Sequence, residues 1–202
     1  IDVVRGDSDE YTALATFGDR LFAFKRETLY IINIGSPSPA NWFLESTERK
    51  KGVASKSGVW QSQDGIFWAN NFGAFFFDGS GIVNLIKGKI PQKDWFVHGS
   101  AIHKSVCHHE ITNNLYVIGT NIPTNVTGDS IGAYIYNFDS KGWSKSGQSN
   151  GTTIDRVISA LLPDRTGGVV FNDIAGVASG STATNQRSIS ESANGDSVAA
   201  TK

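Results

Sequence analysis

One group of residues in this chain has the composition of a metal site. It lies in the run His103-Lys-Ser-Val-Cys107-His108-His109. If this run is a strand, residues two apart share a face, so His103, Cys107 and His109 would point the same way. Thiolate and imidazole are ligands that zinc accepts, but zinc needs them wrapped in a tetrahedron, and strand neighbours spread along a row. With no evident fourth ligand, we expect polar residues of a sheet and no metal or other cofactor.

Cys107 is the only cysteine, so the chain has no internal disulfide framework. As a nucleophile, its thiol would need a neighbouring base. His108 is adjacent in sequence, but on a strand it would lie on the opposite face. No glycine motif typical of an oxyanion hole accompanies the pair. We therefore predict no catalytic residue here or elsewhere, and no enzymatic activity.

The run Ser62-Gln-Asp-Gly-Ile-Phe-Trp68 resembles the Asp box of sialidases, Ser-x-Asp-x-Gly-x-x-Trp, although here glycine follows aspartate directly. That box is a folding element at a hairpin turn and holds no catalytic residue. Sialidase chemistry needs an arginine cluster, a tyrosine nucleophile and an acid. The arginines of this chain are scattered, which neither supports nor excludes a cluster. We interpret the run as a structural turn.

Three charged groups remain. Asp7-Ser-Asp9-Glu10 lacks the glycine and the distant glutamate of a calcium loop, so we interpret it as a solvated turn. The basic groups are Arg49-Lys50-Lys51 and the set Lys87, Lys89 and Lys93. Either basic group has the charge to bind phosphates. Lysine at a sheet edge also prevents the edge strand from pairing with other chains. We favour solvated faces, since no phosphate-binding glycine loop occurs.

Composition indicates sheets and tight turns. The 202 residues carry a net charge of −1, with 18% charged residues, 11% aromatic residues and 22 glycines. No apolar run is long enough for a membrane-spanning helix. Near-neutral charge argues against a dedicated nucleic-acid binder. Because the sequence lacks methionine even at its start, we expect a processed chain or a piece of a longer one.

Short apolar runs separated by Asn/Asp-Gly and similar turns predict strands along most of the chain. The turns at Asn70–Gly73 and Asp78-Gly79 predict a three-stranded meander over residues 65–86. The expected strands are residues 20–25, 29–34, 65–69, 74–77, 81–86, 101–110, 115–119, 132–138, 157–162 and 169–171, with another opening at Trp143.

Equivalent strands recur at a spacing typical of propeller blades. Leu21, Ile66, Leu115 and Val169 each follow a turn and lie 45, 49 and 54 residues apart. A lone meander cannot cover both of its faces, whereas neighbouring blades cover each other. We predict an all-β fold for residues 1–175, a β-propeller-like array of about four antiparallel meanders. The array is either a complete small propeller or a segment of a larger one.

Residues 176–202 differ in composition from the rest of the chain. They hold no aromatic residue, and their large aliphatic residues are Val177, Ile189 and Val198. Such a segment cannot bury enough apolar surface to offset the entropy lost on ordering. We predict an extended Ser/Ala/Gly-rich tail, either an arm that lies on a neighbouring subunit or a mobile terminus.

Several runs together resemble a known family. They are Gly18-Asp-Arg-Leu-Phe-Ala-Phe24, Asp64-Gly-Ile-Phe-Trp68, Ala133-Tyr-Ile-Tyr-Asn-Phe138 and Lys141-Gly-Trp143. Their order over about residues 14–145 is similar to the propeller of tail hub and nozzle proteins of short-tailed bacteriophages. The resemblance implies a virion structural protein. It would form a ring of copies below the portal, extend the DNA conduit and dock other tail components. It carries over no binding or catalytic residue, and the long loop at 120–130 departs from the pattern.

Two other function classes stay open. One is a carbohydrate-binding or glycan-cleaving propeller of lectin, tailspike or sialidase type, because tryptophan rings stack on sugars. The other is a scaffold for cellular protein assembly. The basic groups raise the further hypothesis of non-specific contact with the DNA backbone in the channel. The tryptophans concerned in the first class are Trp42, Trp60, Trp68, Trp95 and Trp143.

Overall fold

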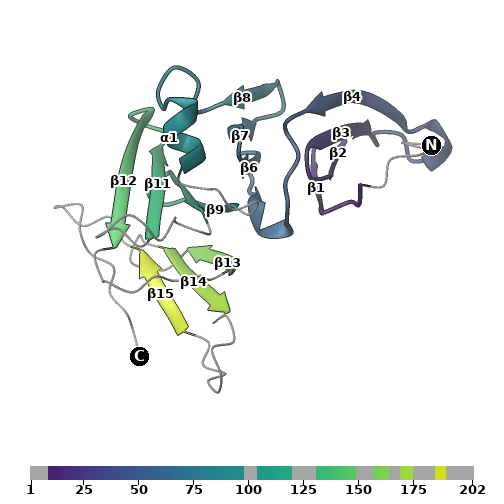
Figure 1. Cartoon of the computed structure of the whole chain (residues 1–202). Coiled ribbons are helices and arrows are strands. Elements are labelled where there is room, and N and C mark those ends of the chain that lie inside the picture. Colours follow the sequence, from purple (N-terminus) through teal and green to yellow (C-terminus); the bar gives the residue numbers. More distant parts are fainter. Residues whose placement is uncertain are drawn as a thin grey trace.

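The computed structural model describes residues 9–97, 104–119, 131–148, 157–163, 169–174 and 185–189. In this part of the chain, strands form three four-stranded sheets and one three-stranded sheet, all antiparallel. The helices described there are α1 (Gln92–Val97) and the 3-10 turns η1 (Pro39–Asn41) and η2 (Lys56–Gly58). The predicted all-β class is confirmed. In each sheet the strands lie in chain order, so every sheet is an up-and-down meander (Figure 1).

Sheet 1 is the N-terminal meander. Its strands are β1 (Ala13–Phe17), β2 (Arg20–Phe24), β3 (Thr28–Asn33) and β4 (Phe43–Arg49). β2 and β3 match the hairpin that the sequence predicts. Gly18 makes the β1–β2 turn with a φ of +55°, a left-handed conformation that glycine adopts without steric cost. β4 escapes prediction because it is a largely exposed edge strand whose side chains do not alternate between apolar and polar.

Sheet 2 has one strand more than the sequence predicts. Its strands are β5 (Val59–Gln61), β6 (Ile66–Asn70), β7 (Gly73–Phe77) and β8 (Ile82–Asn84). The predicted three-stranded meander over residues 65–86 is confirmed as β6, β7 and β8, and β5 adds a fourth strand before it. The three residues of β5 are too short a run to show a period in sequence, yet they pair with β6 over their whole length.

Sheet 3 follows α1. Its strands are β9 (Lys104–His109), β10 (Asn114–Gly119), β11 (Ile131–Asn137) and β12 (Gly142–Gln148). Sheet 4 consists of β13 (Val157–Pro163), β14 (Val169–Ile174) and β15 (Asn185–Ile189). β15 lies within the stretch 176–202 and pairs with β14. The rest of that stretch is outside the described residues.

Sheet 2 lies between sheets 1 and 3 and buries side chains on both of its faces (Figure 1). Toward sheet 1 it presents Ile66 and Trp68, which meet Phe22 and Phe24. Toward sheet 3 it presents a second apolar set, which meets Leu115 and Val117; the set is Phe67, Ala69, Ala74 and Phe76. Alternation along a strand explains this arrangement, because successive side chains point to opposite faces.

The first strands of the sheets adjoin one another in chain order. β1 contacts β5, β5 contacts β9, and β9 contacts β13. The first strands therefore lie along one side of the stack, and the later strands of each meander extend away from it.

Candidate functional site

The Cys/His run forms β9 and is buried. Cys107 and His109 share a face of the strand, as its alternation predicts, while His103 lies outside the described residues. His109 Nδ1 accepts a hydrogen bond from the Thr112 backbone N–H at 3.3 Å, which ties the strand to its turn. In the described part of the chain, no three His, Cys, Asp or Glu side chains converge as a metal ion would require.

Cys107 has the properties of a packing residue. It is fully buried, and burial raises the pKa of its thiol to about 12. The thiolate is the reactive form, so a thiol with this pKa is a poor nucleophile at neutral pH. Its sequence neighbour His108 lies on the other face, where its ring stacks on Phe67 at 4.6 Å.

His108 contributes to the core between sheets 2 and 3. Burial lowers the pKa of His108, an effect partly opposed by its hydrogen bond with Asn113 Oδ1 at 3.2 Å. Its Nδ1 is buried without a hydrogen-bond partner. Stacked against Phe67 and edge-on to Phe138, the neutral ring behaves as an aromatic core residue.

The run that resembles an Asp box forms the β5–β6 turn. Ser62 N–H donates to the Gly65 carbonyl at 2.9 Å, and Asp64 N–H donates to Ser62 Oγ at 3.1 Å. Gly65 has a φ of +152°, and a Cβ there would collide with the Phe77 carbonyl oxygen. Trp68, at the end of the run, is fully buried. These contacts are those of the structural turn that we expect.

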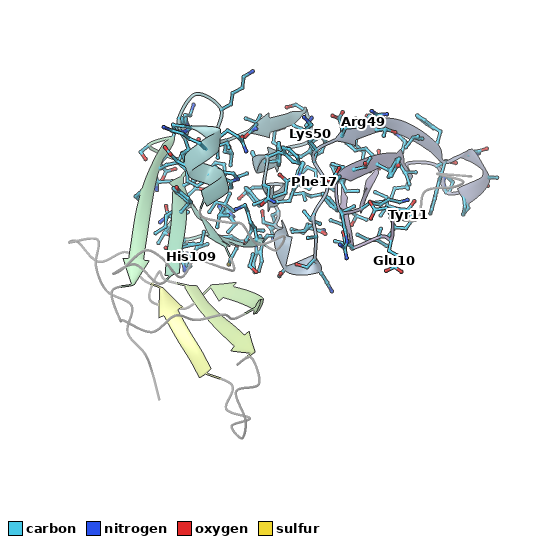
Figure 2. All side chains as sticks on the ribbon, viewed as in Figure 1. Glu10, Tyr11, Phe17, Arg49, Lys50 and His109 are labelled. Carbon is cyan, nitrogen blue, oxygen red and sulfur yellow. The ribbon has the colours of Figure 1, made fainter. Side chains whose placement is uncertain are left out.

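The first basic group lies where β4 leads toward β5, and Figure 2 shows Arg49 and Lys50 close together there. Lys51 pairs with Glu48 at 2.7 Å. The Lys50 ammonium lies 5.4 Å from the centre of the Phe72 ring. This group is therefore partly neutralised and packed against a neighbouring turn.

All three lysines of the second basic group are exposed, and one of them contacts sheet 3. Lys89 donates to the Tyr136 hydroxyl at 3.2 Å, and its ammonium lies 4.6 Å from the centre of that ring. This contact ties the segment after β8 to sheet 3. Lys87 and Lys93 are exposed. In the acidic group, Glu10 is exposed, and Asp7 lies outside the described residues.

The tryptophans serve the cores. Trp68 and Trp95 are fully buried and present no ring face to a sugar. Trp42 and Trp143 are half-buried, and their indole N–H groups donate to the carbonyls of Ser36 at 2.8 Å and Leu85 at 3.0 Å. Trp60 is also half-buried and packs against the core between sheets 2 and 3.

Sequence reasoning missed Lys104, a buried lysine at the start of β9. Its ammonium lies 4.9 Å from the centre of the Trp95 ring, and burial lowers the pKa of Lys104 to about 8. The sequence predicts that a lysine between apolar residues is exposed to solvent. The burial of Lys104 is shown only by its place on the face of β9 that points toward sheet 2.

The second missed feature is the outer face of sheet 1, the face turned away from sheet 2. Alternation and strand register assign to it Leu14, Thr16, Leu21, Ala23, Thr28, Tyr30, Ile32, Leu44, Thr47 and Arg49. Its centre is buried, with Ala23, Tyr30 and Ile32 packed against Leu21 and Trp42. Its edge strands are open, because Leu14 is 62% exposed and Leu44 is 40% exposed. The signal in the sequence is that residues 20–34 are apolar on both faces.

In comparisons with known proteins, no protein-family model matches the chain, and no curated protein matches it. In the part of the chain that the structure describes, no helix is long and apolar enough to cross a membrane.

Proposed function

We propose that this chain is a structural component of a bacteriophage tail, of the nozzle or hub type. In this proposal the meanders are blades of a propeller-like array. Copies of the chain form a ring that extends the DNA conduit and docks other tail components. The observation that carries the proposal is the outer face of sheet 1, which has an apolar centre and exposes Leu14 and Leu44 at its edges beside the polar Thr16, Thr47 and Arg49. Exposed apolar patches of this kind are typical of protein–protein contacts.

The arrangement of the sheets supports the propeller-like part of the proposal. Each of sheets 1–3 is a four-stranded meander, and sheet 2 is covered on both faces by its neighbours. The first strands β1, β5, β9 and β13 adjoin in order, as the innermost strands of successive blades do.

The positions of the residues that could do chemistry support a structural role. The Cys107 thiol has a raised pKa, His108 is stacked in a core, and the Asp64 turn closes a hairpin. In an enzyme such groups would converge on a pocket with perturbed acids and bases. Here each is engaged in packing or in a local turn.

A glycan-binding propeller is the alternative, and the tryptophans favour it less. Stacking on a sugar needs an open ring face, whereas Trp68 and Trp95 are enclosed. A glycan array distinguishes the two functions. We expect no binding above a bovine serum albumin control, and binding that disappears in Trp60→Ala would favour the alternative.

The direct test places the chain in a particle. Antibodies raised against the chain, applied to purified virions of the phage that encodes it, should label the tail below the portal in electron micrographs. Pre-immune serum is the control. Purified particles that lack the chain, or label confined to the head, would contradict the proposal.

Contact with DNA is a separable part of the proposal, carried by Lys87 and Lys93. Each lysine that neutralises a phosphate contributes about 0.9 to the slope of log affinity against log salt for duplex DNA. The double variant Lys87→Ala/Lys93→Ala should therefore reduce that slope by about 2. Lys51→Ala is the matched control, because this lysine is already paired with Glu48. An unchanged slope in the double variant would exclude contact through these lysines.

A further inference from the structure

His108 lies in the core between sheets 2 and 3, and its neighbours determine which ring nitrogen carries the proton. The carboxylate of Asp139 only accepts hydrogen bonds, so the Asn113 Nδ2 group donates to Asp139 Oδ1 at 2.7 Å. Asn113 therefore turns its own Oδ1, an acceptor, toward His108 Nε2 at 3.2 Å. Because an acceptor faces Nε2, the proton of the neutral imidazole ring lies on Nε2, and Nδ1 carries only a lone pair.

This unprotonated nitrogen is enclosed by aromatic rings. His108 is buried, and its Nδ1 has no hydrogen-bond partner in the part of the chain that the structure describes. The ring stacks on Phe67 at 4.6 Å and meets Phe138 edge-on at 5.6 Å. Phe67 also stacks on Phe76 at 4.6 Å, so the histidine is one ring of a cluster that joins sheet 2 to sheet 3. A second proton would bind at Nδ1 and place an N–H without an acceptor inside this cluster.

The charged groups near His108 are at the rim of the cluster. They come from the β5–β6 turn, the end of β9 and the segment after β11, and the same core also receives two lysines; these groups are Asp64, His109, Glu110, Asp139, Lys89 and Lys104. The three carboxylates are exposed, so solvent and salt weaken their attraction for an imidazolium. Burial is the largest influence and lowers the pKa of His108, although the bond to Asn113 and the nearby carboxylates oppose it.

The position of His108 is polar in each of sheets 1–3, but only sheet 3 has a titratable residue there. By strand register its equivalents are Thr16 and Gln61, each paired with the aliphatic residue that recurs in the next strand. The Thr16 backbone N–H donates to Gln61 Oε1 at 3.3 Å, so this position joins sheets 1 and 2 as well. Among the described residues, the core between sheets 1 and 2 holds no titratable side chain. A proton at this position therefore acts on the second interface and not on the first.

We propose that protonation of His108 at Nδ1 opens the contact between sheets 2 and 3 in mildly acidic solution, while sheets 1 and 2 stay packed. The inference concerns the chain itself and does not depend on the proposed tail function. In the closed state the new N–H has no acceptor, so the ring must leave Phe67 and reach water, which separates β9 from β6.

The direction of the pH effect follows from the two states. The open state takes up the proton near the ordinary pKa of 6.5, whereas the closed state, with its lowered pKa, takes it up only in more acidic solution. The closed state is therefore fully favoured above pH 6.5. Below pH 6.5 the equilibrium between closed and open states shifts toward the open state by up to about tenfold per pH unit.

The first measurement tests the position of the proton. A long-range ¹H–¹⁵N correlation spectrum of histidine-labelled protein at neutral pH should show His108 with a protonated Nε2 and an unprotonated Nδ1. The signal that disappears in His108→Phe gives the assignment. A proton on Nδ1 at neutral pH, or a His108 ring that becomes charged at pH 6.5 or above, would overturn the inference.

The second measurement locates the opening. Hydrogen exchange followed by mass spectrometry, expressed as protection factors, should show protection in β9 and β10 falling by about 3- to 10-fold between pH 6.5 and pH 5.5. Protection in β2 and β3 should stay constant. An equal fall in β2 and β3 would mean that acid destabilises the whole chain and would contradict an opening confined to the second interface.

Two variants and one control assign the effect to His108. His108→Phe keeps an aromatic ring in the stack without a titrating nitrogen, and His108→Gln introduces the residue found at the equivalent position of sheet 2. Circular dichroism at neutral pH shows which of them folds, and a folded variant should lose the fall in protection. His109→Gln, which changes the adjacent histidine on the other face of β9, should keep it. Groups such as Lys104 are common to all variants and cancel in the comparison. A fall that persists in a folded His108 variant would exclude this histidine as the cause.

Discussion

The two interfaces that sheet 2 makes differ in chemistry although they share one architecture. The interface with sheet 1 is built from Ala, Phe, Leu, Ile, Val and Trp side chains. The interface with sheet 3 also holds polar groups: Trp95 N–H donates to the Asn70 carbonyl at 2.8 Å, His108 stacks on Phe67, and the Lys104 ammonium faces Trp95. The core of the first interface is therefore apolar, with polar contacts at its rim such as Arg20 Nη1–H to the Gly79 carbonyl at 3.4 Å, whereas hydrogen bonds and charge enter the core of the second.

The difference has a local cause. Between sheets 2 and 3 the chain inserts residues 85–97, which end in α1 and bring Trp95 against the end of β6. A helix and its approach carry backbone groups that need partners, so polar contacts enter this core. β4 leads into sheet 2 through residues 50–58, which hold the 3-10 turn η2 but no α-helix and add the apolar Val53 to the first core. The predictions below test this contrast, beginning with the largest effect.

The largest loss is expected from the first interface. Trp68 is fully buried and packs on Phe22, Phe24 and Phe75. Trp68→Ala should lower the free energy of unfolding by about 4 kcal/mol, from lost burial and the cavity that remains. Urea unfolding followed by circular dichroism measures the change. A loss below about 1 kcal/mol would show that this core is not close-packed.

The next effect concerns the turn that positions sheet 2 in both interfaces. Gly65→Ala should cost about 3 kcal/mol, because the residue has a φ of +152° and a Cβ would strike the Phe77 carbonyl oxygen. Gly81→Ala is the matched control, since a Cβ there meets nothing within 4 Å. Equal unfolding midpoints for the two variants would contradict this account of the turn.

The second interface should respond to pH through Lys104. Its pKa falls from 10.5 to about 8 in the folded protein, so its contribution to stability is complete above pH 10.5 and is lost as pH falls through 8. At pH 7 the buried charge therefore costs stability, and Lys104→Met should gain about 2 kcal/mol. The variant should also lack the rise in stability between pH 8 and 10.5.

The pH series is read as the difference between wild type and Lys104→Met, which cancels the titration of shared groups such as the Cys107 thiol. Trp68→Phe, in the first interface, should keep the rise. If Lys104→Met keeps it as well, the rise comes from another group.

A smaller effect separates the two buried tryptophans. Trp68 Nε1 is buried without a hydrogen-bond partner, whereas Trp95 Nε1 donates to Asn70. Trp95→Phe should therefore cost about 1 kcal/mol more than Trp68→Phe, because it leaves the Asn70 carbonyl unpaired. Thermal unfolding of both variants in one buffer checks the difference. The opposite order would show that the two cores do not differ in polarity as described.

The smallest effect lies at the rim of the first interface. Arg20 Nε lies 2.9 Å from both carboxylate oxygens of Glu45, and this pair lowers the pKa of Glu45. Because both side chains are one-third exposed, Glu45→Gln should cost only about 0.5 kcal/mol, and salt should reduce that cost. A cost that persists in 1 M NaCl would mean that the pair is more enclosed than its exposure indicates.

The parts of the fold that the sequence predicts are those with a strong apolar period. The strands around Leu21, Ile66 and Leu115 and the glycine or asparagine turns before them lie where the pattern places them. β4 and β5 have no such pattern: β4 is a largely exposed edge strand, and β5 has three residues. The helix α1 is also missed, because six residues give too short a window for a helical period.

The candidate surface is harder to predict than the strands. The alternation at residues 20–34 indicates apolar residues on both faces, but it does not say which face stays open. That depends on which sheet follows which, and on the position of β13 beside β9. The burial of Lys104 likewise follows from the packing of α1 and not from its neighbours in sequence.

One consequence follows from the strands of every sheet pairing only with their neighbours along the chain. Among the described residues no strand is shared between meanders, so one meander can fold before the ribosome has synthesised the next, and short-range pairing of this kind favours rapid folding. The same property makes the meander a heritable module. An in-frame duplication or deletion of about 45 codons would add or remove a whole sheet and leave the hydrogen bonds of the others intact.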